Sequence, residues 1–125
     1  MTEYQPGVCN IGPAEIARRK RVGYFGLALT VVLWVVLVRL NVPHVWRLLV
    51  FFPAAIAAGG FLQAYFKFCA NFGLRGVLNF GPVGKTESVV QAEARKLDRQ
   101  KAWQIISLSI LAGFAVGVVA YLLPV

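Results

Sequence analysis

At 125 residues the chain has room for one domain, and 58% of its residues are hydrophobic whereas 14% are charged. A soluble domain carries roughly 25% charged residues, and so short a chain has too much surface to hide this much apolar area in water. The net charge of +8 lies in short clusters beside apolar runs, as in proteins that meet lipid headgroups, so we expect an integral membrane protein with no nucleic-acid partner.

Three apolar stretches, over residues 22–40, 46–67 and 102–123, predict transmembrane helices. Each comes close to the roughly 20 residues that cross about 30 Å of hydrocarbon. Backbone polar groups in lipid need partners within the chain, so such spans must be helical. The sequence therefore predicts an all-α membrane protein with three transmembrane helices, built as a single domain over residues 1–125.

The loop between the second and third spans, residues 68–101, has two parts. The first is rich in Gly, Asn and Phe, and predicts an irregular stretch whose Phe68 and Phe72 lie at the headgroup boundary. The second predicts an amphipathic helix with a capping box at Ser88 and Gln91 and with Asp98 on its polar face. Since no helix breaker follows, we expect this cytoplasmic helix to continue into the third span.

The basic residues predict the orientation of the chain. Eleven of the thirteen Lys and Arg residues precede the first span or lie in or beside the loop 68–101, and Arg39 and Arg47 flank the short link between the first two spans. Segments rich in Lys and Arg stay in the cytoplasm. We therefore expect a cytoplasmic (inner) membrane, with the N-terminus inside and the C-terminus outside.

Two basic clusters are candidates for contact with anionic lipid headgroups. Each charge near such a surface contributes about 1 kcal/mol. Orienting the chain is the simpler role, and docking an acidic partner is the alternative. The clusters comprise Arg18, Arg19, Lys20, Arg21, Arg95, Lys96, Arg99 and Lys101.

Small residues recur at four-residue spacing in the second and third spans, which lets helix backbones approach closely. They indicate packing within one bundle or, alternatively, a seam between copies of the chain along Gly113 and Gly117. The chain itself and another membrane subunit are therefore candidate partners. The small residues are Ala54, Ala58, Gly59, Gly113 and Gly117.

Cys9 and Cys69 are the only cysteines. Both fall on the predicted cytoplasmic side, where thiols stay reduced, and neighbouring basic residues favour the thiolate. The pair is thus a candidate site for a soft metal or a persulfide. Two thiols are fewer ligands than a tetrahedral metal site needs, and two unrelated small residues are the alternative interpretation.

Three further patterns argue against nucleotide binding, a membrane haem and ion-coupled transport. The segment 81–86 ends like a phosphate-binding loop, but Asn79 stands where that motif requires glycine. His44, the only histidine, cannot supply both axial ligands of a membrane haem. The interiors of the predicted spans hold no ionisable residue, whereas ion-coupled transporters usually keep one. We expect no cofactor and no enzymatic activity.

Near the N-terminus, Asn10-Ile11-Gly12 followed by Glu15, Arg19 and Gly23 resembles the opening of a family of small bacterial inner-membrane domains of unknown function. Some members of that family are fused to rhodanese-type sulfurtransferases. This chain departs from the family at Ile16, where an Arg is usual, and adds a cytoplasmic helix and a third span. The resemblance implies a membrane-anchored helper module near sulfur chemistry, with Cys9 and Cys69 as the residues to test.

Three functions remain open. A non-enzymatic accessory, assembly or scaffold subunit, acting through helix packing and its basic cytoplasmic face, fits the sequence best. A small oligomeric transporter or channel is the second, suggested by the Gly-rich loop and by Gly59 and Gly60 in the second span. A thiol-based metal- or sulfur-handling module that uses Cys9 and Cys69 is the third.

Overall fold

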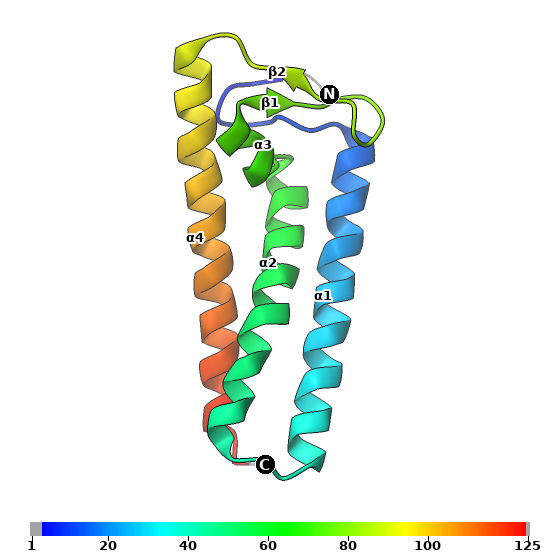
Figure 1. The fold of residues 1–125 in the computed structure, drawn as a ribbon, viewed down its shortest axis with the longest axis vertical. Helices are drawn as coiled ribbons and strands as arrows, with labels where there is room; N and C mark the ends of the chain where they lie inside the picture. Colours follow the sequence, from blue (N-terminus) through cyan, green and yellow to red (C-terminus); the bar gives the residue numbers. More distant parts are fainter. Residues whose placement is uncertain (1–3, 125) are drawn as a thin grey trace.

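The computed structural model describes residues 4–124, in which three long helical segments run side by side (Figure 1). The long helices are α1 (Pro13–Arg39), α2 (Phe51–Phe66) and α4 (Ala92–Leu122). The short elements are the 3₁₀ helix η1 (His44–Val50), α3 (Ala70–Arg75), β1 (Val77–Leu78) and β2 (Glu87–Ser88). At one end of the bundle, α3, the two strands and the N-terminal segment gather into a folded layer. We call this layer, residues 4–12 and 67–91, the cap.

The predicted fold class is confirmed. Helix α1, the helical segment His44–Phe66 and helix α4 are each long and apolar enough to cross a membrane. The predicted spans end one residue beyond α1, α2 and α4, within the ordinary uncertainty of helix ends. Helix α4 runs without a break from the cap into its apolar part, as the missing helix breaker predicted.

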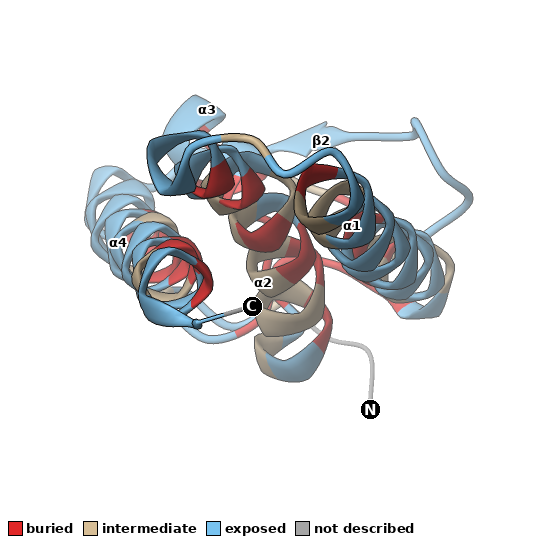
Figure 2. Ribbon diagram, turned by 90° about the horizontal axis from the view of Figure 1, so that it is seen from below, coloured by how far each residue is buried: buried red, intermediate tan, exposed pale blue. Residues whose placement is uncertain are grey.

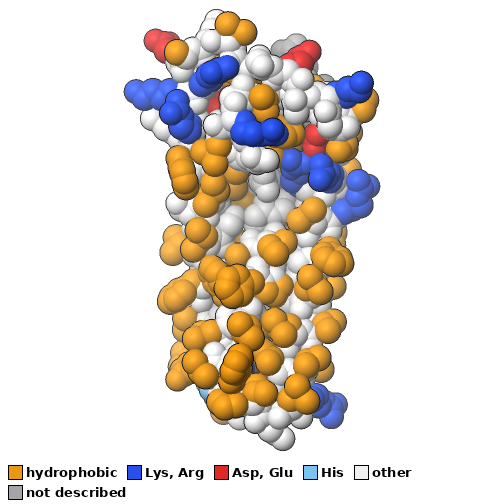
Figure 3. All heavy atoms as spheres, viewed as in Figure 1, with side chains coloured by type: hydrophobic (Ala, Val, Ile, Leu, Met, Phe, Trp, Pro, Cys, Tyr) orange, Lys and Arg blue, Asp and Glu red, His pale blue; other side chains and the backbone are white. Residues whose placement is uncertain are grey.

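An apolar band surrounds the bundle between two polar ends. Figure 3 shows hydrophobic side chains over most of the length of the visible face, with Lys and Arg at the cap end and again at the opposite end. Large side chains in this band are mostly outside, such as Phe25, Leu111 and Phe114, each more than 60% exposed. So large an exposed apolar surface requires an apolar surrounding, and a bilayer supplies one.

Helix α2 lies between α1 and α4 and packs against both (Figure 2). Its buried residues are small: Ala54, Ala57, Gly60 and Ala64. Against α1, the approach is closest at Gly60, where an added Cβ would lie 2.5 Å from the backbone nitrogen of Gly23. One turn further on, a Cβ on Gly26 would lie 2.7 Å from the nitrogen of Ala57. The α1–α2 interface therefore depends on glycines that the four-residue spacing did not single out.

On the other side of α2, Gly113 is the contact point with α4. A Cβ on Gly113 would lie 2.8 Å from Ala55 Cβ and 2.9 Å from the carbonyl oxygen of Phe51. Gly117 also faces this side, with more space: a Cβ there would lie 3.6 Å from Phe51 Cβ. Both glycines therefore face α2 and η1 of their own chain, the first of the two arrangements that their spacing indicated.

Arg47 and His44 close the end of the bundle opposite the cap. Arg47 is 3% exposed; its Nη1 donates to the carbonyl oxygen of Leu123 at 2.9 Å, and its guanidinium lies 5.1 Å from the ring of Trp34. His44 Nδ1 lies 2.9 Å from the carbonyl oxygen of Tyr121. The last carbonyls of a helix lack partners within the helix and attract cations. Both side chains thus lie against backbone carbonyl groups at the C-terminal end of α4.

Two local predictions for the loop 68–101 are wrong. Helix α4 begins at Ala92, and Ser88 pairs with Val77 in the two-stranded ladder, so Ser88 and Gln91 form no capping box. The stretch after Cys69 is not irregular at the headgroup boundary either: it contains α3, and Phe68 and Phe72 are buried. In each case packing or pairing with another segment decides the structure.

Candidate functional site

Four buried polar residues hold the cap together and join it to the bundle: Asn10, Glu15, Asn79 and Asp98 are each at most 1% exposed. A buried polar group is costly unless it is hydrogen-bonded, and each of the four has partners. Asn10 lies in the N-terminal segment, Glu15 in α1, Asn79 directly after β1 and Asp98 in α4. The cap is therefore held in place by specific hydrogen bonds.

Asn10 joins the N-terminal segment to the start of α3. Its Oδ1 accepts the backbone N–H of Cys69 at 2.7 Å, and its Nδ2 donates to the Cys69 carbonyl at 3.2 Å. The backbone beside it pairs with Asn79, whose N–H donates to the Asn10 carbonyl at 3.0 Å. Gly12 continues this contact, and a Cβ there would lie 2.8 Å from the carbonyl oxygen of Phe80.

Glu15 is the buried carboxylate at the start of α1. Its Oε2 accepts from Asn79 Nδ2 at 2.8 Å and from the N–H of Gly84 at 3.3 Å, and its Oε1 forms an ion pair with Arg19 one turn later. The N–H of Gly84 belongs to the segment that ends like a phosphate-binding loop. It is occupied by this carboxylate, and strand β2 follows where that motif requires a helix.

Asp98 fastens the N-terminal segment to α4. Its Oδ1 accepts the N–H of Gly7 at 2.7 Å, and its Oδ2 accepts the hydroxyl of Tyr4 at 2.6 Å. Burial, together with the Asp98 carboxylate, raises the pKa of Tyr4 above its ordinary value. The amphipathic pattern of 92–101 places Asp98 on the polar face of its helix, yet this face is covered by the N-terminal segment.

A pocket of about 510 Å³ lies beside Glu15, between α1, α3 and the loop that leads to β2. We call it the basic pocket. Arginine dominates its charge, because Glu15 is the only carboxylate among its described lining residues. The lining residues are Glu15, Arg18, Arg19, Val22, Gln63, Cys69, Asn71, Phe72, Arg75, Gly84 and Thr86.

The three arginines of the basic pocket differ in their surroundings. Arg19 pairs with Glu15, donates from Nη2 to Cys69 Sγ at 2.8 Å, and lies 5.3 Å from the centre of the Phe72 ring. Arg75 lies 5.5 Å from the same ring. Neither Arg18 nor Arg75 pairs with a carboxylate among residues 4–124. The charge of Arg19 is thus balanced by Glu15, whereas no carboxylate among these residues balances the charges of Arg18 and Arg75.

The two cysteines are both free and buried, in different surroundings. Cys69 Sγ accepts from Arg19 in the wall of the basic pocket. Cys9 Sγ instead lies 3.6 Å from the carbonyl oxygen of Ile11. Among the residues that the structure describes, no group of three or more His, Cys, Asp and Glu side chains could hold a metal ion. Of the two cysteines, Cys69 is therefore the one whose sulfur contacts a charged side chain.

The other predicted basic residues are spread over the cap end of the molecule. Lys20, Arg21, Lys96 and Arg99 are exposed. Lys101 Nζ lies 3.9 Å from the centre of the Phe66 ring. Arg95 donates from Nε to the carbonyl oxygen of Val89. The structure thus brings Arg18 and Arg19 of the N-terminal cluster to the basic pocket and leaves the α4 cluster apart from its lining.

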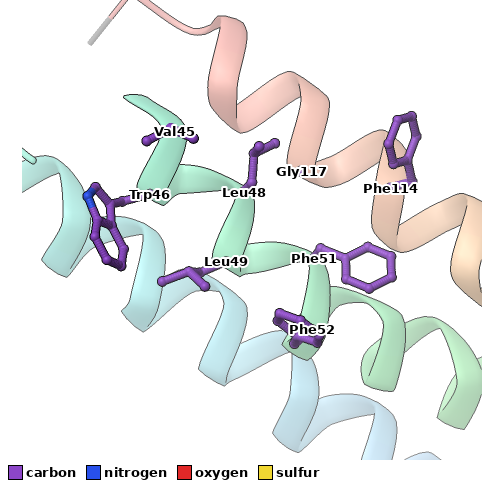
Figure 4. Close-up of a pocket in the computed structure, with 8 residues that line it drawn as sticks. All are labelled: Val45, Trp46, Leu48, Leu49, Phe51, Phe52, Phe114 and Gly117. Atoms are coloured by element: carbon purple, nitrogen blue, oxygen red, sulfur yellow. The ribbon is translucent and has the colours of Figure 1, made fainter. Parts of the chain in front are cut away.

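A second hollow, of about 540 Å³, lies near the other end of the bundle. Figure 4 shows that its side chains come from η1, α2 and α4. Its lining is mostly apolar and includes Trp46, Phe52 and Phe114, together with Gly117 of α4. Such a groove on the apolar band suits a lipid chain or an apolar helix, and nothing in it points to catalysis.

Comparison with known proteins gives no match to a protein-family model, a curated protein or a solved structure. The residues that carry the N-terminal resemblance nevertheless have clear positions in this structure. Asn10 and Glu15 hold the cap, Arg19 pairs with Glu15, and Gly23 lies in the α1–α2 interface.

Proposed function

We propose that this chain is a non-enzymatic membrane protein of the accessory, assembly or scaffold type, acting through its folded basic end. The observation that carries this proposal is the cap, which four buried polar residues hold together and join to the bundle. A chain that only needed to be anchored could leave its connecting loop free in water. Fixing this loop with buried polar groups costs desolvation free energy, which suggests that the shape of the cap matters.

We further propose that the cap lies in the cytoplasm and that the membrane is a cytoplasmic (inner) membrane. Support comes from the eleven Lys and Arg residues on the cap side of the spans against two on the other, because basic segments are retained inside. The cap would then present a basic surface to anionic headgroups or to an acidic partner.

Single cysteines test the orientation. Lys85→Cys places a thiol in the exposed turn of the cap, and Pro43→Cys places one in the exposed link at the opposite end. A membrane-impermeant maleimide applied to intact cells should label Pro43→Cys and leave Lys85→Cys unlabelled until the membrane is opened. Both native cysteines are buried, so the unmodified chain gives the background. Labelling of Lys85→Cys in intact cells would overturn the orientation.

Crosslinking in cells followed by purification in mild detergent tests the accessory role. We expect a second polypeptide to be recovered reproducibly with the chain, and the yield to fall when the cap is loosened by Asn10→Ala. Repeated recovery of the chain alone, as a monomer, would contradict the proposal.

A thiol-based function is the second candidate, and the contact between Arg19 Nη2 and Cys69 Sγ at 2.8 Å favours it. Reactive cysteines are found in electropositive surroundings of this kind. The test compares sulfane sulfur and metal retained by the purified protein before and after Cys69→Ser, with Cys9→Ser as the matched control. An equal content in all three proteins would end this candidate.

A further inference from the structure

Arg18 stands between the basic pocket and a third hollow, of about 540 Å³, on the outer side of α1. This third hollow is lined by Arg18, Arg21, Val22, Phe25 and Val83. The two hollows share Arg18 and Val22, so they adjoin each other along one face of α1. The two adjoining hollows make one candidate site, which is lined by arginines and, in the third hollow, also by the apolar side chains of Val22, Phe25 and Val83.

The charge of this site is not balanced by the protein. Glu15 is its one described carboxylate, and Arg19, Asn79 and Gly84 already occupy both of its oxygens. Arg18, Arg21 and Arg75 form no ion pair within residues 4–124. Like charges gathered in one place destabilise the folded chain, and an anion bound between them would relieve that repulsion.

The geometry of the arginines suits an oxoanion. Arg18 projects from α1 and Arg75 from the end of α3, so they reach the basic pocket from two different elements. Phe72 restricts Arg75, whose guanidinium lies 5.5 Å from the ring centre. A guanidinium has a planar fork of donors that matches phosphate oxygens, and stacking on an aromatic ring reduces the freedom it loses on binding.

The apolar half of the site suits the acyl chain of a phospholipid. Val22 and Phe25 are 41% and 65% exposed, and both lie in the predicted first span immediately after the run of basic residues 18–21. This is the depth at which a phosphate meets acyl chains in a bilayer. A soluble anion would use the arginines but would leave Val22 and Phe25 uncovered.

We propose that Arg18, Arg21 and Arg75 bind a phosphate group, and that an anionic phospholipid supplies it, with its acyl chain along Val22 and Phe25. This is one stoichiometric site, distinct from the diffuse attraction of a basic surface for a charged membrane. It stands on the two hollows and their arginines, and it does not require the accessory role proposed above.

A matched pair of charge removals separates a site from diffuse attraction. The double variant Arg18→Gln and Arg75→Gln removes two arginines from the basic pocket. The double variant Lys96→Gln and Arg99→Gln removes the same charge from exposed positions on the cytoplasmic part of α4. Native mass spectrometry in detergent, with added phosphatidylglycerol, measures how much of each protein carries one lipid.

We expect the first variant to bind phosphatidylglycerol about tenfold more weakly than the unmodified protein, since charge-assisted hydrogen bonds to phosphate are lost. The second variant should change by less than about twofold, because Lys96 and Arg99 line neither hollow and exposed charges outside a binding site contribute little. Equal weakening in both variants, or none in either, would overturn the site. If the first variant is not recovered folded, Arg75→Gln against Arg99→Gln makes the same comparison.

Two further ligands separate the sources of the phosphate. Phosphatidylcholine has the same phosphate with a neutralising choline, and we expect it to bind more weakly than phosphatidylglycerol. Inorganic phosphate tests the anion without the acyl chain, and we expect the lipid to bind more tightly. Tight binding of inorganic phosphate that Arg18→Gln and Arg75→Gln abolish, with no preference for the lipid, would overturn the lipid source. Binding of phosphatidylglycerol and phosphatidylcholine alike would do the same.

Discussion

At the scale of single residues, the structure is decided by polar groups that are buried. Glu15 stands in the first turn of α1, where a carboxylate also suits the helix dipole. Its larger role is to meet Arg19, Asn79 and Gly84 from three directions. One side chain thus joins α1 to both ends of the loop segment 79–84. Its loss should therefore destabilise the whole cap.

We predict that Glu15→Gln lowers the free energy of unfolding by about 3 kcal/mol, because removing one partner of a buried ion pair leaves the other uncompensated. Thermal unfolding of the purified protein in detergent, followed by the exposure of Cys69 to a thiol-reactive dye, measures the change. Glu87→Gln is the control, since Glu87 is exposed in β2. A variant as stable as the unmodified protein would contradict the role of Glu15.

Asn10 gives a second prediction, which the rate of alkylation of Cys69 measures. Without its amide, the N–H of Cys69 loses its partner at the start of α3, and the Cys69 carbonyl keeps only the N–H of Gly73. A buried backbone group without a partner favours local opening. In a Cys9→Ser background, Asn10→Ala should speed alkylation of Cys69 about tenfold or more, which corresponds to losing one or two hydrogen bonds. Glu93→Ala, at an exposed position in the first turn of α4, should leave the rate unchanged.

At the scale of elements, the spans followed from simple physical limits. A stretch without charge that is long enough to cross hydrocarbon has one stable backbone structure, so each span could be predicted from its own residues. The interfaces between helices could be predicted only in part. The four-residue spacing identified Gly113, whereas Gly23 and Gly26 are three residues apart and meet α2 at points no local pattern marks.

The cap could not be predicted for the same reason. Asn10 and Cys69 are 59 residues apart, and Glu15 and Asn79 are 64 apart. A polar residue beside a span looks alike whether it faces water or a partner from elsewhere in the chain. Thus neither Asn79 nor Arg75 stood out from the sequence, and Asp98 was placed on the polar face of its helix without its partner.

Neighbouring glycines in α2 provide a test of the α1–α2 interface. Gly60→Ala would place a Cβ 2.5 Å from Gly23, whereas Gly59→Ala would place one 3.4 Å from the hydroxyl of Ser109. Overpacking against backbone costs about 1–3 kcal/mol, so Gly60→Ala should unfold at a clearly lower temperature in detergent. Gly59→Ala should unfold near the unmodified protein. The opposite order would show that the two helices do not meet at Gly60.

At the scale of the whole molecule, two kinds of stabilisation are combined. The bundle is held by close packing of small residues within an apolar surrounding, and the cap by hydrogen bonds between segments distant in sequence. Water competes for the cap's hydrogen bonds but not for contacts inside the bilayer. The cap should therefore open while the bundle stays intact, as local unfolding in the least stable part of a protein.

Asp98 allows the two parts to be separated experimentally. Asp98→Ala removes the acceptor for the hydroxyl of Tyr4 and the N–H of Gly7, but it leaves a good helix former in α4. We expect limited trypsin digestion in detergent to cut at Lys85 several-fold faster, while the helical signal in circular dichroism stays nearly unchanged. Glu93→Ala, at an exposed position in the first turn of α4, should digest like the unmodified protein. If Asp98→Ala instead lost helical signal together with protection of Lys85, cap and bundle would unfold as one unit, and the cap would be part of what holds the spans together.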